Sequence, residues 1–294
     1  MSRKFDIPVA HIDEPDAVGD LLATLRQIHG PAYEFALRTW EGETRLSAPK
    51  DKTIYRFVMR TERAALRLHP GDLVRGLPGA PGGVGRIQMA KQEALWPGDV
   101  ITTGPEMGDG LVTGSGVCFE ITAETTAYPA PKAAFLRHLP DHPGGCAAYP
   151  NAFRREVLPP DKEAANAASK RGHNRVNEHT LDMRPDRDPL PSRHHHGQVA
   201  DATGPINHTE TALVLPRSIY GLPLPNGTEE GRAVIYRDPL NKKASDAFIV
   251  PVRPGSLVVT PSTGERLYGH AFENAFAMLV AVPGFVAPYV MIPD

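Results

Sequence analysis

The stretch RPGSLVVTP, residues 253–261, joins a Pro-Gly turn to a short apolar strand. A second stretch, WPGDVITTG at residues 96–104, has the same order of a Pro-Gly pair and an alternating strand. Pro-Gly pairs mark tight turns, and alternation of apolar and polar residues is typical of strands. One such stretch in each half of the chain indicates a weak internal repeat.

The sequence around both stretches consists of short apolar runs separated by turns. Its 30 prolines and 27 glycines make up about a fifth of the 294 residues and are spread along the chain. This punctuation is typical of many short strands. We predict strands at 53–60, 63–69, 85–91, 99–104, 116–125, 175–183, 209–216, 231–238, 246–255, 256–261 and 275–284.

Two segments have helical patterns instead. Residues 13–30 carry apolar side chains at helical spacing and stop at Gly30, and Asp13 or Asp16 could cap the start. Residues 160–172 are rich in alanine and charge, which predicts a helical connector. The apolar residues of the first helix are Val18, Leu21, Leu22, Leu25 and Ile28.

The two runs of strands have no alternation with helices, which indicates antiparallel sandwiches or barrels. The helical connector divides them into a domain at residues 1–160, which includes the N-terminal helix, and a domain at residues 173–294. We expect Trp96 and Phe119 to lie in the core of the first domain.

Composition excludes several classes of partner. The formal net charge is −2 and the basic residues are scattered, so we expect no nucleic-acid face. The N-terminus lacks the apolar region of a signal peptide, and the longest C-terminal apolar run contains Pro283 and Pro288, which argues against a membrane span. Cys118 and Cys146 form no disulfide framework. We expect a soluble, cytoplasmic protein that acts on a small molecule.

The C-terminal run VAVPGFVAPYVMI is more apolar than one edge strand requires. We expect part of it to face a second subunit, in a homodimer or a larger homo-oligomer.

Four of the twelve histidines lie within fifteen residues, in the stretch HHHGQVADATGPINH. His194 and His196 are two residues apart, so on a strand they share a face. His208 and Glu210 have the same spacing, and His270 ends a later strand-turn unit. Three imidazoles and a carboxylate suit Fe(II), Mn(II), Ni(II) or Zn(II). Spacing alone leaves open the alternative of a polar loop with no metal.

The segment from 253 to 274 resembles the second motif of the cupin superfamily. Gly255, five residues, Pro261, a turn containing Gly264, then His270, three residues and Asn274 follow that motif, with a longer turn before the histidine. The first cupin motif, His-x-His followed by Glu on the next strand, is similar to His194-x-His196 with Glu210. An insertion separates these two parts, so His208 is an alternative ligand in place of one of the pair.

The resemblance covers residues 173–294 and implies a bicupin. Such a chain is mainly β, with two cupin-like antiparallel β-barrels (double-stranded β-helix, or jelly roll) and a few helices. It implies a degenerate first barrel and a second barrel that binds a divalent transition metal through His194, His196, Glu210 and His270, with His208 in reserve.

The resemblance also implies three functions. The first is a non-haem dioxygenase acting on a small substrate with a carboxylate or carbonyl group. The second is a metal-dependent isomerase or lyase, and the third is a ligand-binding cupin without catalysis. The polar residues that follow or flank the metal strands could hold an anionic substrate. They are Arg217, Tyr220, Tyr236 and Arg237.

Overall fold

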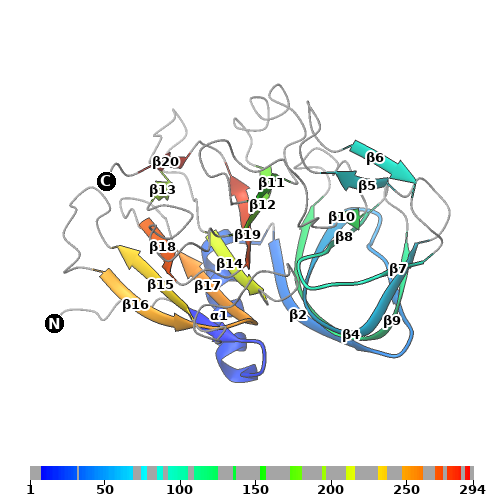
Figure 1. Ribbon diagram of the computed structural model, residues 1–294, viewed down its shortest axis with the longest axis horizontal. Coiled ribbons are helices and arrows are strands. Elements are labelled where there is room, and N and C mark those ends of the chain that lie inside the picture. Colours follow the sequence, from blue (N-terminus) through cyan, green and yellow to red (C-terminus); the bar gives the residue numbers. More distant parts are fainter. Residues whose placement is uncertain are drawn as a thin grey trace.

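The computed structural model describes part of the chain in detail. The described residues are 8–31, 33–68, 74–77, 85–88, 92–104, 109–124, 135–136, 153–156, 173–180, 194–196, 210–215, 231–236, 247–260, 269–273, 277–285 and 289–291. They form strands in three sheets and one helix, so the prediction of a mainly β chain is confirmed (Figure 1). No helix in these residues has the length and hydrophobicity that a membrane span requires.

The first half forms a nine-stranded sheet. Its order is β2 (Tyr33–Glu41), β9 (Gly110–Glu124), β4 (Lys52–Leu68), β8 (Val100–Thr103), β10 (Phe135–Leu136), β5 (Val74–Leu77) and β6 (Gly85–Gln88), with β3 (Thr44–Leu46) on β9 and β7 (Glu93–Ala94) on β4. Its long strands curve around an apolar interior (Figure 1).

The second half contributes two sheets. The six-stranded sheet has the order β1 (Val9–His11), β17 (Ser256–Thr260), β14 (Glu210–Leu215), β19 (Ala277–Phe285), β12 (His173–Thr180) and β11 (Phe153–Glu156). The five-stranded sheet has the order β16 (Ala247–Val252), β15 (Gly231–Tyr236), β18 (Gly269–Glu273), β13 (His194–His196) and β20 (Tyr289–Met291).

The first strand of the chain crosses to the sheet of the C-terminal strands. Val9 to His11 pair antiparallel with β17, with Val9 opposite Val258. The N-terminal segment is therefore part of the six-stranded sheet, although the sequence assigns it to the first domain. The predicted connector at 160–172, where the domain boundary was placed, lies outside the described residues.

The predicted helix is confirmed as α1 (Pro15–His29). Proline occupies its first turn, where the missing N–H costs no hydrogen bond. The residue at the N-cap is Glu14, and no side chain caps the helix, so the expectation for Asp13 or Asp16 is wrong. Asp13 pairs instead with Arg60 of β4 at 2.8 Å.

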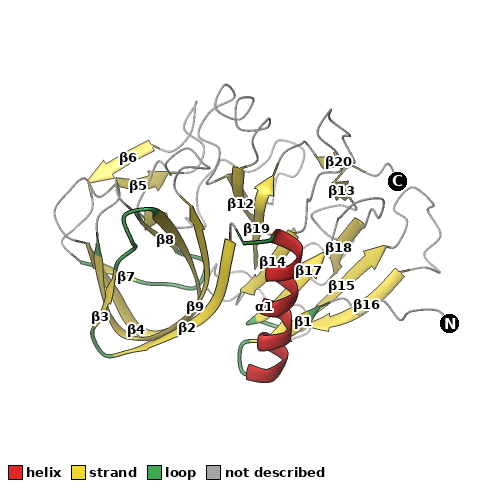
Figure 2. Ribbon diagram, turned by 180° about the vertical axis from the view of Figure 1, so that it is seen from behind, coloured by secondary structure: helices red, strands yellow, loops and turns green. Residues whose placement is uncertain are grey.

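The helix packs into one core that both halves share. Val18, Leu21, Leu22 and Leu25 are buried there. The nine-stranded sheet contributes Tyr33, Phe35, Tyr55, Phe57, Met59, Phe119, Ile121 and Ala123, and the six-stranded sheet contributes Ala10, Leu213, Leu257 and Val259. Figure 2 shows α1 beside β14 and β17, next to the end of β2. This shared core fixes the N-terminal helix against both halves.

The internal repeat predicted from the two Pro-Gly stretches has a close structural counterpart. Gly98 and Gly255 have φ of 92° and 93°, a conformation that favours glycine. In the first turn the Trp96 N–H donates to Asp99 Oδ2 at 2.9 Å, and in the second the Arg253 N–H donates to Ser256 Oγ at 3.1 Å. The two turns are thus built alike.

The strands after these turns also correspond. Gly98 N–H donates to the Val58 carbonyl at 2.7 Å, and Gly255 N–H donates to the Val214 carbonyl at 2.8 Å. In the first half β8 pairs antiparallel with β4, and in the second β17 pairs antiparallel with β14. The pairs β4–β8 and β14–β17 are therefore equivalent.

Two expectations for the first half are corrected. Residues 53–60 and 63–69 belong to one strand, β4, because irregularities after Val58 and Glu62 bend it without ending it. Trp96 is 53% exposed because it stands at the first position of its turn, whereas Phe119 is fully buried as expected.

We predict that Leu25→Ala lowers the free energy of unfolding by about 2–5 kcal/mol. Leu25 is fully buried in the shared core, so the truncated side chain leaves a cavity between α1 and the sheets. Urea denaturation measures the change. The exposed Gln27, on the same helix, provides the control Gln27→Ala, which should change stability by about 0.5 kcal/mol or less. Equal effects of the two variants would contradict this role of α1.

His29 predicts a pH dependence of stability. Its Nε2 is buried with no hydrogen-bond partner among the described residues, and burial lowers its pKa from 6.5 to about 4. The unfolded chain therefore binds the proton more readily, so stability is full above pH 6.5 and falls as the pH drops toward 4. The loss reaches about 3 kcal/mol for this ring. Denaturation curves at several pH values measure this loss of stability. The loss should be absent in His29→Leu.

Candidate functional site

Two of the predicted metal-ligand segments are neighbours in the five-stranded sheet. His194 of β13 lies directly opposite His270 of β18 in an antiparallel pair. On the other side of β18, His270 lies opposite Ile235 of β15. Two histidines that are distant in sequence thus share one rung of the sheet.

The burial of β15 identifies which face of this sheet the rung belongs to. Ala233 and Ile235 are fully buried, while Arg232, the residue before Ala233, is exposed. Directly opposed residues on neighbouring strands lie on the same face. By register, the positions of His194 and His270 share one rung with the buried Ile235. The position of His196 is two residues from that of His194 along β13.

Glu210 lies in the six-stranded sheet, on β14 opposite Thr260 of β17. Both faces of this strand are buried, because Thr211 to Val214 are 0–1% exposed. Leu213 belongs to the shared core with α1. Ala212 and Val214 alternate with Leu213 and are absent from that core, and the position of Glu210 is two residues before Ala212.

For the remaining predicted residues, the structure describes the backbone alone or does not describe the residue. Tyr236 ends β15, opposite Gly269 and Ala247. The backbones of His194, His196, Glu210 and His270 are described and their side chains are not, so the four-ligand set stays a prediction. His208, Arg217, Tyr220 and Arg237 lie outside the described residues.

The donor set itself fits a transition metal. Three neutral imidazoles and one carboxylate are ligands that Fe(II), Mn(II), Ni(II) and Zn(II) accept. In the register of the sheets, His194 and His270 share a rung of one sheet and Glu210 pairs with Thr260 in the other. Among the side chains that the structure describes, no group of three or more His, Cys, Asp or Glu could hold a metal ion.

The equivalent strands of the first half carry different side chains. In the corresponding pairs, Ile54 opposite Thr103 takes the place of Glu210 opposite Thr260. The next residue on the same face is Arg56, where the second half has Ala212. The first half thus has an apolar residue at the position of the predicted carboxylate ligand and a cation beside it.

Arg56 is enclosed by hydrogen bonds. Its Nε donates to Glu120 Oε1 at 2.7 Å, Nη1 to Thr103 Oγ1 at 2.7 Å, and Nη2 to the Ser47 carbonyl at 3.1 Å. The Arg56 side chain is 6% exposed and that of Glu120 is 12% exposed. These partners satisfy the hydrogen-bond donors and the charge of the Arg56 guanidinium. It therefore stabilises the interior of the first half rather than offering a free cation to a ligand.

Cys118 lies on the strand that carries Glu120. Burial first, and then the Glu120 carboxylate, raises the pKa of its thiol to about 12. A thiol with this pKa stays protonated at neutral pH and is a poor nucleophile. Cys118 therefore belongs to the apolar interior of the first half and not to a reactive site.

A pocket that the sequence does not indicate lies in the second half. It has a volume of about 540 Å³ and is bordered by β1, the start of α1, β15, β16 and the turn before β17. Its polar lining includes His11, Glu14, Arg232, Arg253 and Ser256. It depends on the pairing of β1 with β17, and no local pattern in the sequence predicts that pairing.

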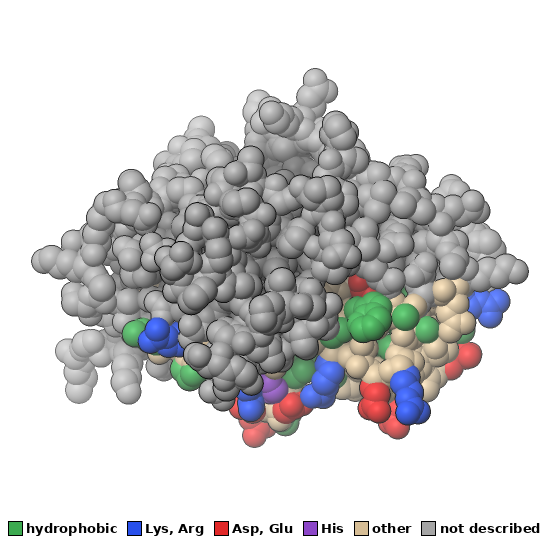
Figure 3. Space-filling model, in the orientation of Figure 1, with side chains coloured by type: hydrophobic (Ala, Val, Ile, Leu, Met, Phe, Trp, Pro, Cys, Tyr) green, Lys and Arg blue, Asp and Glu red, His purple; other side chains and the backbone are tan. Residues whose placement is uncertain are grey.

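The charged side chains of the described surface are mixed in sign. Figure 3 shows Lys and Arg interspersed with Asp and Glu along the described part of this face. The described residues in this view form no continuous basic band of the kind that binds nucleic acid.

No protein-family model and no curated protein sequence matches the chain. Solved structures match it in fold. Procruciferin, an 11S globulin from Brassica napus, is 11% identical with a TM-score of 0.46, over 91% of this chain and 80% of that one. Salicylate 1,2-dioxygenase from Pseudoaminobacter salicylatoxidans is 10% identical with a TM-score of 0.43, over 97% and 75%.

A third match is the Cupin 2 conserved barrel domain protein from Leptotrichia buccalis. It is 10% identical with a TM-score of 0.40, over 96% of this chain and 91% of that one. These similarities concern the fold alone.

We predict that Glu120→Ala lowers the free energy of unfolding by about 3–5 kcal/mol, because it leaves the buried Arg56 guanidinium without its carboxylate. The exposed Glu34 on β2 provides the control Glu34→Ala, which should change stability by about 0.5 kcal/mol or less. Urea denaturation compares the two variants. A Glu120→Ala protein as stable as the control would mean that Arg56 finds other partners.

Proposed function

We propose that the C-terminal half is a metal-dependent enzyme site of the cupin type, with His194, His196, Glu210 and His270 as ligands and His208 in reserve. The pairing of His194 with His270 on one rung of the five-stranded sheet, opposite the buried Ile235, carries this proposal. When bound, Fe(II), Mn(II), Ni(II) or Zn(II) supplies a Lewis-acid centre with open coordination positions.

The substrate of this site is a small organic molecule with a carboxylate or carbonyl group. Arg217 and Arg237 would hold a carboxylate by paired hydrogen bonds, and Tyr220 and Tyr236 would orient it. The apolar surroundings of Ile235 would exclude water and strengthen these interactions. Of the possible reactions we favour oxidation by dioxygen, so the protein would be a non-haem dioxygenase.

The same residues would serve an isomerase or lyase that moves a proton next to a polarised carbonyl. Metal identity separates the two, because iron favours dioxygen chemistry and zinc or nickel favours proton transfer. A ligand-binding cupin without catalysis would bind substrate and leave it unchanged. The division at 1–160 and 173–294, assembly into a homo-oligomer and a cytoplasmic location stay predictions.

We predict about one metal ion per chain in protein purified without added metal, the content of one four-ligand site. His270→Ala should remove most of this metal with little change in melting temperature, because the apolar core does not include the ion. Elemental analysis by mass spectrometry measures the content, and circular dichroism checks the fold.

His195 offers a matched control, since it lies between His194 and His196 and therefore on the opposite face of β13. His195→Ala should keep the metal. If His270→Ala keeps it as well, or if His195→Ala loses it, the proposed ligand set is wrong. A metal content near two ions per chain would contradict the prediction that the first half binds no metal.

A further inference from the structure

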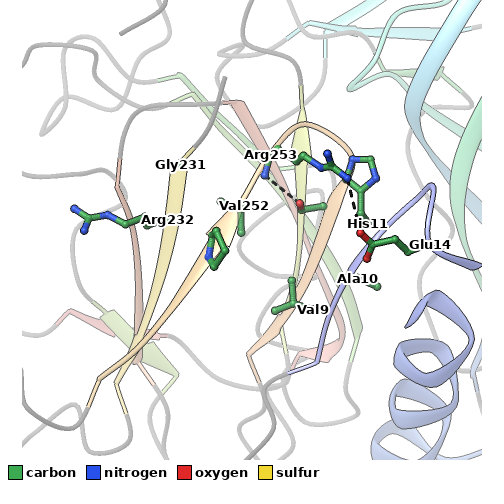
Figure 4. A pocket seen from close by; sticks show the side chains of 10 residues that line it. Val9, Ala10, His11, Glu14, Gly231, Arg232, Val252 and Arg253 are labelled. Carbon is green, nitrogen blue, oxygen red and sulfur yellow. Dashed lines mark hydrogen bonds and ion pairs between the residues drawn. The ribbon is translucent and has the colours of Figure 1, made fainter. Parts of the chain in front are cut away.

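The pocket between β1 and β16 stands where the edges of two sheets separate. β16 is the edge of the five-stranded sheet and β1 the edge of the six-stranded sheet, and the turn at 253–255 joins one sheet to the other. Figure 4 shows Val9 and Val252 on facing sides of the pocket, with Arg253 and His11 at its upper rim.

This pocket is separate from the predicted metal residues. Gly231 lines it, and Ile235, the partner of His270, comes four residues later on the same strand. Ser256 lines it as well, and Thr260, the partner of Glu210, again comes four residues later. Four residues of strand span about 13 Å. The fully buried Ala233 and Val258 fill the same strands in between.

Arg253 is one of three charged residues that line the pocket, with Glu14 and Arg232. Arg253 Nη2 lies 3.8 Å from Glu14 Oε1, and both side chains are more than half exposed, at 57% and 55%. An exposed pair at that separation is weak. A guanidinium has five N–H donors in a planar fork that matches a carboxylate. Arg253 can therefore bind the carboxylate of a ligand in place of Glu14.

Ser256 adds a hydroxyl beside Arg253. The residue is 4% exposed, and its Oγ accepts the Arg253 N–H at 3.1 Å, which leaves its own O–H to donate. His11 is already committed, since Nε2 contacts the Pro254 carbonyl at 2.9 Å and Nδ1 accepts the Asp13 N–H at 3.3 Å. A carbonyl only accepts, so Nε2 carries the proton and His11 holds the turn rather than a ligand.

Part of the pocket lining is apolar. Val9, Ala10, Pro251 and Val252 line it, and Arg232 extends away from them in Figure 4. A volume of about 540 Å³ is that of a small-molecule site. We propose that this pocket binds a small organic carboxylate, with the carboxylate on Arg253 and Ser256 and an apolar body against Val9 and Val252. This site does not depend on the proposed metal function.

Benzoate is the probe, titrated into the metal-free full-length protein by calorimetry and followed by the rise in melting temperature. Benzoate should bind the unmodified chain. Arg253→Gln should weaken it about tenfold to a hundredfold, the effect of losing hydrogen bonds to a charged group. Glu14→Gln should tighten it, because Glu14 competes for the same guanidinium. Arg45→Gln, an exposed arginine of β3, is the control and should change nothing.

Other outcomes overturn the proposal. Benzamide has the same apolar body without the charge, and inorganic phosphate has the charge without the body, so both should bind more weakly. Equal binding of either contradicts the assignment, as does unchanged benzoate affinity in Arg253→Gln. If Arg253→Gln does not fold, unchanged affinity in Glu14→Gln is decisive. Loss of benzoate binding in His270→Ala would place the probe at the predicted metal residues instead.

Discussion

Burial of α1 between the two halves is the constraint on which the rest of the structure depends. Leu25, Phe57 and Phe119 are fully buried in a core that takes residues from the helix and from both large sheets. Each such side chain contributes about 1.5–3 kcal/mol by leaving water. Because Leu213, Leu257 and Val259 of the six-stranded sheet are buried in this core, the face of β14 and β17 that carries them cannot hold a site.

The two halves share a turn and a strand pair but differ in what their interiors hold. Where the second half has Ala212 beside Glu210, the first half has Arg56 beside Ile54. The Arg56 guanidinium is matched by Glu120, Thr103 and Ser47, so its charge is compensated within the protein. A buried ion pair of this kind fills the interior and leaves no ligand position. The two halves therefore differ in their interiors because the residues at corresponding positions of one strand differ.

The N-terminal strand β1 joins residues 9–11 to the C-terminal half and borders the pocket at Arg253. β1 pairs with β17, and His11 holds the turn at Pro254 through its ring. Gly255 is required there, because a Cβ at this position would lie 2.8 Å from His11 Nε2 and its φ of 93° disfavours other residues. The pocket between β1 and β16 follows from this contact, as does the position of Arg253 at its rim.

The sequence by itself determined the N-terminal helix, the Pro-Gly repeat, the residue types of the candidate metal site and many strands from residue 53 onward, because turns, periodicity and ligand chemistry are local properties. It did not predict β2, a strand of nine residues. It could not determine that β4 runs on through two bends, that Trp96 is exposed, or that His194 lies opposite His270, because register depends on distant partners. The sequence also did not predict the pocket at Arg253. Its walls come from residues 9–14 and 231–256, which only the pairing of β1 with β17 brings together.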